Sequence, residues 1–254
     1  SSYDLAMTTL QDGNYVVAWQ ASSNIYLQKL SSTGSLLGST VAVDGTNTTD
    51  MMPQLIATPD GGYVLSWETS AASDIYVQKF DSTNTPVGSE VRLDNGNSGP
   101  DRDSDIAVLS DGSYVVTWFW WPNNGQGDAY VQKFNSDGTK SGSIITLSGP
   151  GGSSTWDQYP KVTGLNDGGY VVSWTGYAAT YNSGDIFIQR FDANNNLVGT
   201  LKQLQGSNNN DSAPQITATT DGGYVVVWRG MDTASNQSDV YVQKYDASNN
   251  PVGG

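Results

Sequence analysis

The chain has 254 residues, of which 14% are charged, and its 11 basic and 25 acidic side chains give a net charge of −14. A chain this acidic repels phosphates, which excludes nucleic-acid binding. No stretch approaches the roughly 18 apolar residues of a membrane-spanning helix, so we expect no membrane insertion. With no Cys and no His, it also lacks disulfides, thiolate metal sites and any mechanism that needs an imidazole.

A unit of about 50 residues recurs five times along the chain, a period typical of propeller blades. Its most regular part is an Asp-Gly turn followed by a Tyr-Val-Val-x-Trp run, which first appears as DGNYVVAW at 12–19. A second string follows each copy, beginning with NIYLQKL at 24–30. The repeated tryptophans are 48, 51, 56 and 54 residues apart, at Trp19, Trp67, Trp118, Trp174 and Trp228.

Each unit contains four strand signals in the same order. In the second unit, PQLIAT at 53–58 and YVLSW at 63–67 are the first two, and an Asp-Gly turn between them is a strong hairpin signal because that turn needs positive φ. The third is IYVQKF at 75–80, and the weaker fourth is PVGSEVRL at 86–93. No segment keeps a helical period, so the sequence predicts an all-β fold.

Four antiparallel strands in each of five units predict a five-bladed β-propeller. We expect one domain over residues 1–254, with blades at about 4–52, 53–103, 104–159, 160–213 and 214–254. An open stack of the same units is the alternative. A closed ring with the first strands lining its axis is preferred, because closure removes the sheet edges that an open array must protect. The last unit ends where its fourth strand is expected, so either a very short strand suffices or the natural chain continues.

The consensus P-x-V/I-x-x-L/T-x-DGGYVVxW, followed by DIYVQRFD-x-x-N-x-x-VG, resembles repeats of very large secreted bacterial proteins. These are the haemolysin-type, RTX-like calcium-binding adhesins and surface proteins. The resemblance covers essentially the whole chain and implies an extracellular setting with a role in surface attachment. The glycine-rich calcium-binding nonapeptide of those proteins is absent, so calcium binding does not carry over by motif. The layout is also similar, in geometry only, to five-bladed lectins of the tachylectin type.

Residues that recur in every unit are expected to build the blades. The repeated Trp and Tyr side chains belong to this group. The repeated Gln amides are expected to satisfy backbone groups between blades, and the repeated Lys or Arg stems to cover the neighbouring blade. These two sets are Gln28, Gln78, Gln132, Gln189 and Gln243, and Lys29, Lys79, Lys133, Arg190 and Lys244.

The connections between second and third strands, and between fourth and first strands, share one end of a propeller. Both sets vary in length here, whereas the opposite end carries the uniform Asp-Gly turns. Binding residues concentrate in variable loops on a rigid scaffold. We therefore expect the functional site at the variable-loop end.

Acidic residues near the start of each first strand form one candidate site there. An acidic ring at the mouth of the axial channel would suit Ca²⁺, and turn capping is the competing interpretation. The run DRDSD begins like an EF-hand loop, but Ile106 stands where glycine is required. The candidate calcium ligands are Asp50, Asp101, Asp103, Asp105, Asp157 and Asp211.

Aromatic residues outside the repeat pattern form the second candidate site. Their planes suit the apolar face of a sugar, and neighbouring amides and carboxylates suit its hydroxyls. Packing of a long loop onto its own blade is the competing interpretation. The candidate ligand-binding residues are Trp120, Trp121, Asn123, Asn124, Trp156, Asp157, Tyr177 and Tyr181.

The preferred function is therefore a secreted, carbohydrate-binding or adhesive propeller of lectin type, which takes glycans or cell-surface polysaccharide and is not an enzyme. The net charge favours neutral sugars. The alternative is a self-associating structural module, such as a surface-layer or filament subunit or a spacer in a large extracellular protein. A hydrolase that uses two Asp side chains is the third hypothesis, although no pair can be singled out.

Overall fold

The computed structural model describes residues 4–43, 49–70, 74–94, 96, 99–122, 127–149, 156–177, 184–204, 210–232 and 237–254. In these ranges, twenty strands form five antiparallel sheets of four consecutive strands each. The predicted all-β, five-bladed propeller class is therefore confirmed. The described part of the chain contains no helix that is both long and apolar enough to cross a bilayer.

Each sheet follows the order of the chain, and its first strand lies beside the first strands of the neighbouring sheets. Sheet 1 contains β1 (Leu5–Thr9), β2 (Tyr15–Ala21), β3 (Asn24–Leu30) and β4 (Leu36–Val43), and sheet 2 contains β5 (Asp50–Ala57), β6 (Tyr63–Thr69), β7 (Ile75–Phe80) and β8 (Pro86–Leu93). Sheet 3 contains β9 (Asp101–Val108), β10 (Tyr114–Trp120), β11 (Ala129–Phe134) and β12 (Lys140–Leu147). Sheet 4 contains β13 (Trp156–Gly164), β14 (Tyr170–Tyr177), β15 (Gly184–Phe191) and β16 (Leu197–Leu204), and sheet 5 contains β17 (Ser212–Ala218), β18 (Tyr224–Asp232), β19 (Gln237–Tyr245) and β20 (Pro251–Val252).

The Asp-Gly-Gly turn of sheet 2 shows why these residues recur. Oδ1 of Asp60 accepts the backbone N–H of Gly62 at 3.1 Å, which is a local side-chain turn. Gly61 has φ +85°, a conformation that glycine adopts without steric cost. A Cβ on Gly62 would lie 2.2 Å from the carbonyl oxygen of Phe80, so the turn needs glycine at both positions.

Each sheet packs an aliphatic face against the aromatic face of the next sheet. The aliphatic face carries small and branched side chains of the second and third strands, and the aromatic face carries the repeated Tyr and Trp with aromatic residues of the third strand. At the first interface these are Val16, Ala18, Ile25 and Leu27 of sheet 1 against Tyr63, Trp67, Tyr76 and Phe80 of sheet 2. The same pairing forms the cores between sheets 2 and 3, 3 and 4, and 4 and 5.

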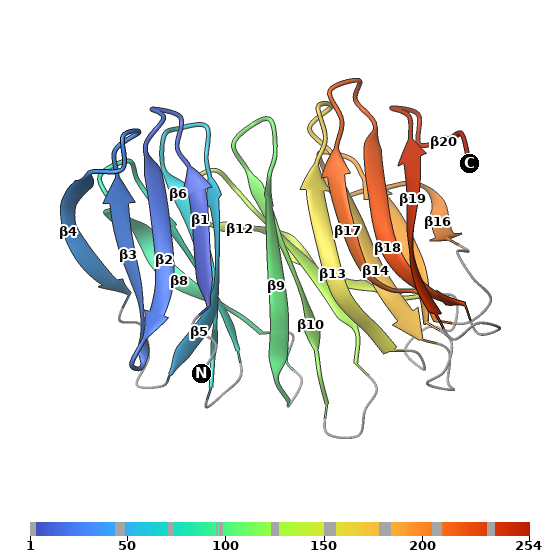
Figure 1. Cartoon of the computed structure of the whole chain (residues 1–254), viewed down its shortest axis with the longest axis horizontal. Coiled ribbons are helices and arrows are strands. Elements are labelled where there is room, and N and C mark those ends of the chain that lie inside the picture. Colours follow the sequence, from blue (N-terminus) through green and yellow to red (C-terminus); the bar gives the residue numbers. More distant parts are fainter. Residues whose placement is uncertain are drawn as a thin grey trace.

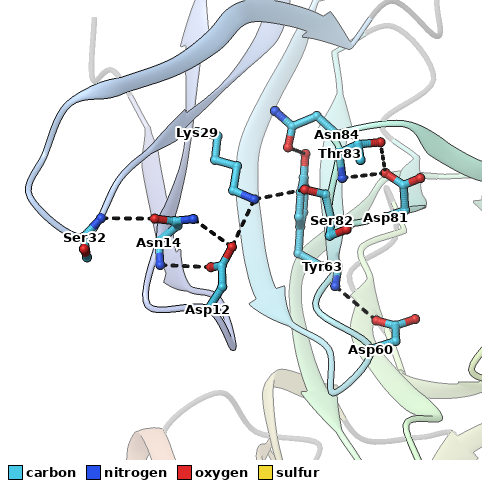
Figure 2. Close-up of polar contacts among 11 residues, drawn as sticks. Asp12, Asn14, Lys29, Ser32, Asp60, Tyr63, Asp81, Ser82, Thr83 and Asn84 are labelled. Carbon is cyan, nitrogen blue, oxygen red and sulfur yellow. Dashed lines mark hydrogen bonds and ion pairs between the residues drawn. The ribbon is translucent and has the colours of Figure 1, made fainter.

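A repeated polar contact, here called the interblade latch, joins neighbouring sheets at the Asp-Gly end (Figure 2). Nζ of Lys29 in sheet 1 donates to the carbonyl oxygen of Ser82 in sheet 2 at 2.9 Å, and to Oδ2 of Asp12 in its own sheet at 3.5 Å. Lys79 donates in the same way to Ser136, Lys133 to Ala193, and Arg190 to Ala247. The recurring cation therefore bonds to the next blade through its charged end.

The recurring Gln does not bridge blades, contrary to our prediction. Nε2 of Gln78 donates to the carbonyl oxygens of Lys79, at 2.7 Å, and Val87, at 3.1 Å, both in its own sheet. The pairing of β7 with β8 shifts between Val77 and Lys79. Such a bulge leaves backbone groups unpaired, and the Gln amide satisfies them locally.

The first strands of sheets 2 to 5 begin before the predicted blade boundaries at 53, 104, 160 and 214. The last strand of sheet 5, β20, is only two residues long. Each of these first strands contains a bulge, at which a residue other than glycine has positive φ. These residues are Met52 (φ 52°), Asp103 (φ 50°), Tyr159 (φ 54°) and Ala213 (φ 53°). The sequence pattern marked only the part of each strand that follows the bulge.

The five blades form an open arc, so the predicted closure of the ring is wrong. Sheets 1 and 5 lie at opposite ends of the molecule, with β9 and β10 of sheet 3 between them (Figure 1). In the described residues, each sheet packs on the next one along the chain, and sheet 1 does not pack on sheet 5. The repeat specifies the contacts between adjacent sheets. Closure of the ring depends instead on the packing angle at each interface, which the residue pattern does not predict.

Candidate functional site

Aromatic side chains gather where β10 of sheet 3 ends beside β13 of sheet 4. The ring centroids of Trp121 and Trp156 are 5.6 Å apart in an edge-to-face arrangement, and Phe119 and Tyr159 are also 5.6 Å apart. Phe119 lies 5.9 Å from Trp121, which joins the two pairs. These four residues are called the aromatic cluster below. Within the cluster, Phe119 is buried, whereas Trp121 is 37% exposed.

The backbone at the end of β10 points successive side chains to opposite faces. The N–H of Trp121 donates to the carbonyl oxygen of Pro100 at 2.7 Å, which fixes this residue beside the cluster. Trp120 instead packs on the core between sheets 2 and 3. A Cβ on Gly127 would lie 1.8 Å from the carbonyl oxygen of Trp120, so the return of the chain to β11 needs glycine here.

A hollow of about 220 Å³ adjoins Trp156. The described residues that line it are two aromatic and two amide side chains: Trp156, Tyr177, Gln158 and Asn210. Trp156 and Tyr177 are direct cross-strand partners in β13 and β14. At Gly184, a Cβ would lie 2.9 Å from the Tyr177 ring and 2.5 Å from the carbonyl oxygen of Asp211. Glycine at this position therefore lets the chain close around the hollow.

Carboxylates lie beside the cluster on the side of sheets 2 and 3. Burial and the charge of Asp103 raise the pKa of the Tyr159 hydroxyl. Oε1 of buried Glu68 accepts the backbone N–H of Asp103 at 2.6 Å, and its Oε2 lies 3.9 Å from Nη1 of Arg102. Burial is the main reason that the pKa of Glu68 rises to about 7. Burial also raises the pKa of Asp103, against the opposing charges of Lys161 and Arg102.

Three of the predicted ligand-binding residues, Trp121, Trp156 and Tyr177, lie together around the cluster and the hollow. Asp157 lies elsewhere, because its side chain is buried inside sheet 4. The predictions for Asn123, Asn124 and Tyr181 lie outside the described residues.

The predicted acidic ring does not form. Among the described residues, no three acidic side chains come close enough together to hold a metal ion. The four aspartates that open the first strands, Asp50, Asp101, Asp157 and Asp211, are buried. Oδ2 of Asp105 accepts the N–H of Val162 in the next sheet at 2.9 Å, and Asp103 lies beside Glu68. The register of each first strand, which the residue pattern did not reveal, turns these carboxylates into the blades.

Sequence reasoning missed Phe119, Tyr159, Gln158 and Asn210. Phe119 follows the repeated Trp118 and appeared to belong to the strand alone. Tyr159 carried a usable signal, because it directly precedes Pro160 at the bulge position of the first strand. A bulge re-aims side chains and is frequent beside binding sites.

No protein-family model and no curated protein matches this sequence. Solved structures do resemble the fold. An α-L-arabinanase of Penicillium chrysogenum, solved with arabinobiose, has a TM-score of 0.60 and 16% identity, over 89% of this chain and 76% of that one. The GH93 α-L-arabinofuranosidase of Fusarium graminearum, also solved with arabinobiose, has a TM-score of 0.60 and 14% identity, over 98% and 81%.

A protein of unknown function from Dyadobacter fermentans has a TM-score of 0.61 and 9% identity, over 97% of this chain and 79% of that one. At these identities the likeness shows the fold alone. The chain is a β-propeller whose structural neighbours include carbohydrate-active enzymes.

Proposed function

We propose that this protein binds neutral carbohydrate at the aromatic cluster and the adjoining hollow, without catalysing a reaction on it. The observation that carries the proposal is the lining of the hollow, which combines the rings of Trp156 and Tyr177 with the amides of Gln158 and Asn210. Ligand sites combine aromatic surface with a few convergent polar groups in this way. Amide groups both donate and accept hydrogen bonds, as sugar hydroxyls require.

The size and the charge of the site favour a small, uncharged ligand. About 220 Å³ lies below the ~300 Å³ at which pockets for drug-sized ligands begin, which suits a single sugar unit of a longer chain. Trp121 extends the apolar surface beyond Trp156 for a neighbouring unit. The net charge of −14 and the adjacent carboxylates disfavour acidic polysaccharides. Two structural neighbours were solved with arabinobiose, a neutral disaccharide.

The burial of Glu68 supports binding rather than hydrolysis. Although its raised pKa is of the kind that a general acid needs, its carboxyl group is buried, bonded to the backbone of Asp103 and close to Arg102. It does not line the hollow. A glycosidase needs two carboxyl groups that flank the scissile bond, and the described residues that line this hollow include no carboxylate.

The proposal includes an extracellular, adhesive role, in which many weak sites on one surface act together. The likeness of the repeat to secreted bacterial surface proteins supports this setting. Cell-surface polysaccharides are the corresponding partners.

The test is a binding titration of the whole chain against a panel of neutral oligosaccharides that includes arabinobiose. We expect Trp156→Ala and Trp121→Ala to lose binding with little change in melting temperature. Trp120→Ala is the matched control, since this residue packs on the core between sheets 2 and 3. It should lower the melting temperature and leave binding by the folded protein intact.

Two results would contradict the proposal. A blank panel would leave the structural module as the better hypothesis. Release of reducing sugar from a polysaccharide by the wild-type chain, lost in Glu68→Gln, would make the protein a hydrolase.

A further inference from the structure

The aliphatic face of sheet 5 has no partner sheet in the described chain. Val240 is 82% exposed and Val242 is 57% exposed. At the same two positions, each of the other four sheets carries a side chain that is almost completely buried against its neighbour. These residues are Ile25 and Leu27, Ile75 and Val77, Ala129 and Val131, and Ile186 and Ile188.

The aromatic face of sheet 1 is exposed in the complementary way. Leu5 is 70% exposed and Met7 is 65% exposed, while Tyr15 and Trp19 are only half-buried. The tyrosines and tryptophans at the positions of Tyr15 and Trp19 are buried in every other sheet: Tyr63 and Trp67, Tyr114 and Trp118, Tyr170 and Trp174, and Tyr224 and Trp228.

The interblade latch is also incomplete at the exposed faces of sheets 5 and 1. Lys244 is the fifth of the recurring cations and pairs with Asp221 of its own sheet at 2.6 Å. Its side chain is 40% exposed, whereas that of Lys79, which reaches the next sheet, is 4% exposed. The carbonyl that would complete the latch is that of Ser32, which occupies in sheet 1 the turn position of Ser82 in sheet 2 (Figure 2).

We propose that the aliphatic face of sheet 5 is an interaction surface for the aromatic face of sheet 1 of a second copy of this chain. The contact would repeat, between molecules, the interface that occurs four times within the chain. Val240 and Val242 would cover the Trp19 side of sheet 1, and Lys244 would donate to the carbonyl oxygen of Ser32. The exposed apolar face of sheet 5 and the exposed ammonium group of Lys244 therefore both match the same partner, sheet 1 of a second copy.

The occupant is a second copy rather than the opposite end of the same chain. Sheets 1 and 5 of one molecule lie at opposite ends of the arc (Figure 1). Closure within one chain would change the packing angle at interfaces whose cores are already buried. Association through two different faces is heterologous, so it extends until the assembly closes into a ring or continues as a filament.

Sedimentation velocity of the whole chain over a series of concentrations tests the proposal. We expect the mass of the wild-type protein to exceed one chain and to rise with concentration. Val242→Asp blocks the aliphatic face and Met7→Asp blocks the aromatic face, so each variant alone should be monomeric. An equimolar mixture of the two variants should form dimers and no larger species, because only one intact aliphatic face and one intact aromatic face remain.

Leu36→Asp is the matched control: Leu36 is exposed on β4, and Leu197, at the same position of sheet 4, stays 66% exposed although sheet 3 covers the aromatic face of that sheet. It should associate like the wild type, and all three variants should keep the wild-type melting temperature at low concentration. Lys244→Met should weaken association about tenfold or more, as expected for a lost hydrogen bond to a charged donor.

A wild-type protein that stays monomeric at all concentrations would overturn the proposal, as would a mixture that stays monomeric. Dimers of Met7→Asp alone would show that like faces pair, which also contradicts it. Monomers in which the fluorescence of Trp19 is shielded from quenchers would indicate closure within one chain instead.

Discussion

Nε1 of Trp174 donates a 2.8 Å hydrogen bond to Oδ1 of Asp157, and both side chains are buried in sheet 4. The two residues are 17 positions apart, one at the start of the first strand and the other in the second strand. A Cβ on Gly176 would lie 2.8 Å from the same carboxylate oxygen. The recurring Asp and Trp of sheet 4 are thus one structural unit, which explains why an aspartate opens the strand.

Replacing Asp157 with Ala should destabilise the fold by about 2–3 kcal/mol, because it leaves the buried N–H of Trp174 without an acceptor. Asp157→Asn keeps an acceptor oxygen and should cost clearly less. Chemical denaturation of the two variants measures both values. Equal losses would show that the charge, rather than the hydrogen bond to Trp174, matters at this position.

The repeated tryptophans should differ in their contribution to stability according to their place in the arc. Trp67 is fully buried between sheets 1 and 2, so Trp67→Ala should cost about 3–5 kcal/mol. Trp19 has the same place in its own sheet but is half-buried. Trp19→Ala should therefore cost about 1–2 kcal/mol in dilute solution, where only partial apolar burial is lost. Equal shifts of the denaturation midpoint in the two variants, relative to the wild type, would contradict the open arc.

Stability should fall as the pH rises from about 4.5 to about 7, in part because of Glu68. Its pKa is about 7 in the folded protein and 4.5 in the unfolded chain. In this range the folded state binds the proton that the unfolded state has released, so the free energy of unfolding decreases with pH. The contribution of this residue is up to about 3 kcal/mol.

Glu68→Gln keeps the acceptor for the N–H of Asp103 and removes the titration. The variant should therefore lose less stability than the wild type between pH 5 and 7, as measured by urea denaturation at each pH. Asp101, with a pKa raised to about 8 mainly by burial, acts in the same direction and remains in both proteins. An unchanged slope in Glu68→Gln would assign the effect to Asp101.

The blade was predictable because its pattern is local. The Asp-Gly turn and the Tyr-Val-Val-x-Trp run that follows it lie within a few residues of one another, and five copies confirmed the period. Closure of the ring was not predictable in this way. It depends on small angles that accumulate over four interfaces, and no single residue encodes them.

The candidate site was predictable only in part, for a related reason. Trp121 and Trp156 stood out because no other repeat has a tryptophan there, and they do meet. The direction of each side chain depended on strand register, which bulges shift. This is why Trp120 and Asp157 were assigned to the surface although both pack into the blades.

The open arc also determines how the molecule should unfold. In the part of the chain that the structure describes, each sheet packs only on its neighbours along the chain, so the stability of the array is close to a sum of blade and nearest-neighbour terms. Sheets 2, 3 and 4 have two such interfaces, whereas sheets 1 and 5 have one. Cooperativity is therefore weakest at the two ends. Amide hydrogens of β2 and β18 should exchange faster than those of β10, and the loss of structure should proceed from the ends of the arc toward sheet 3.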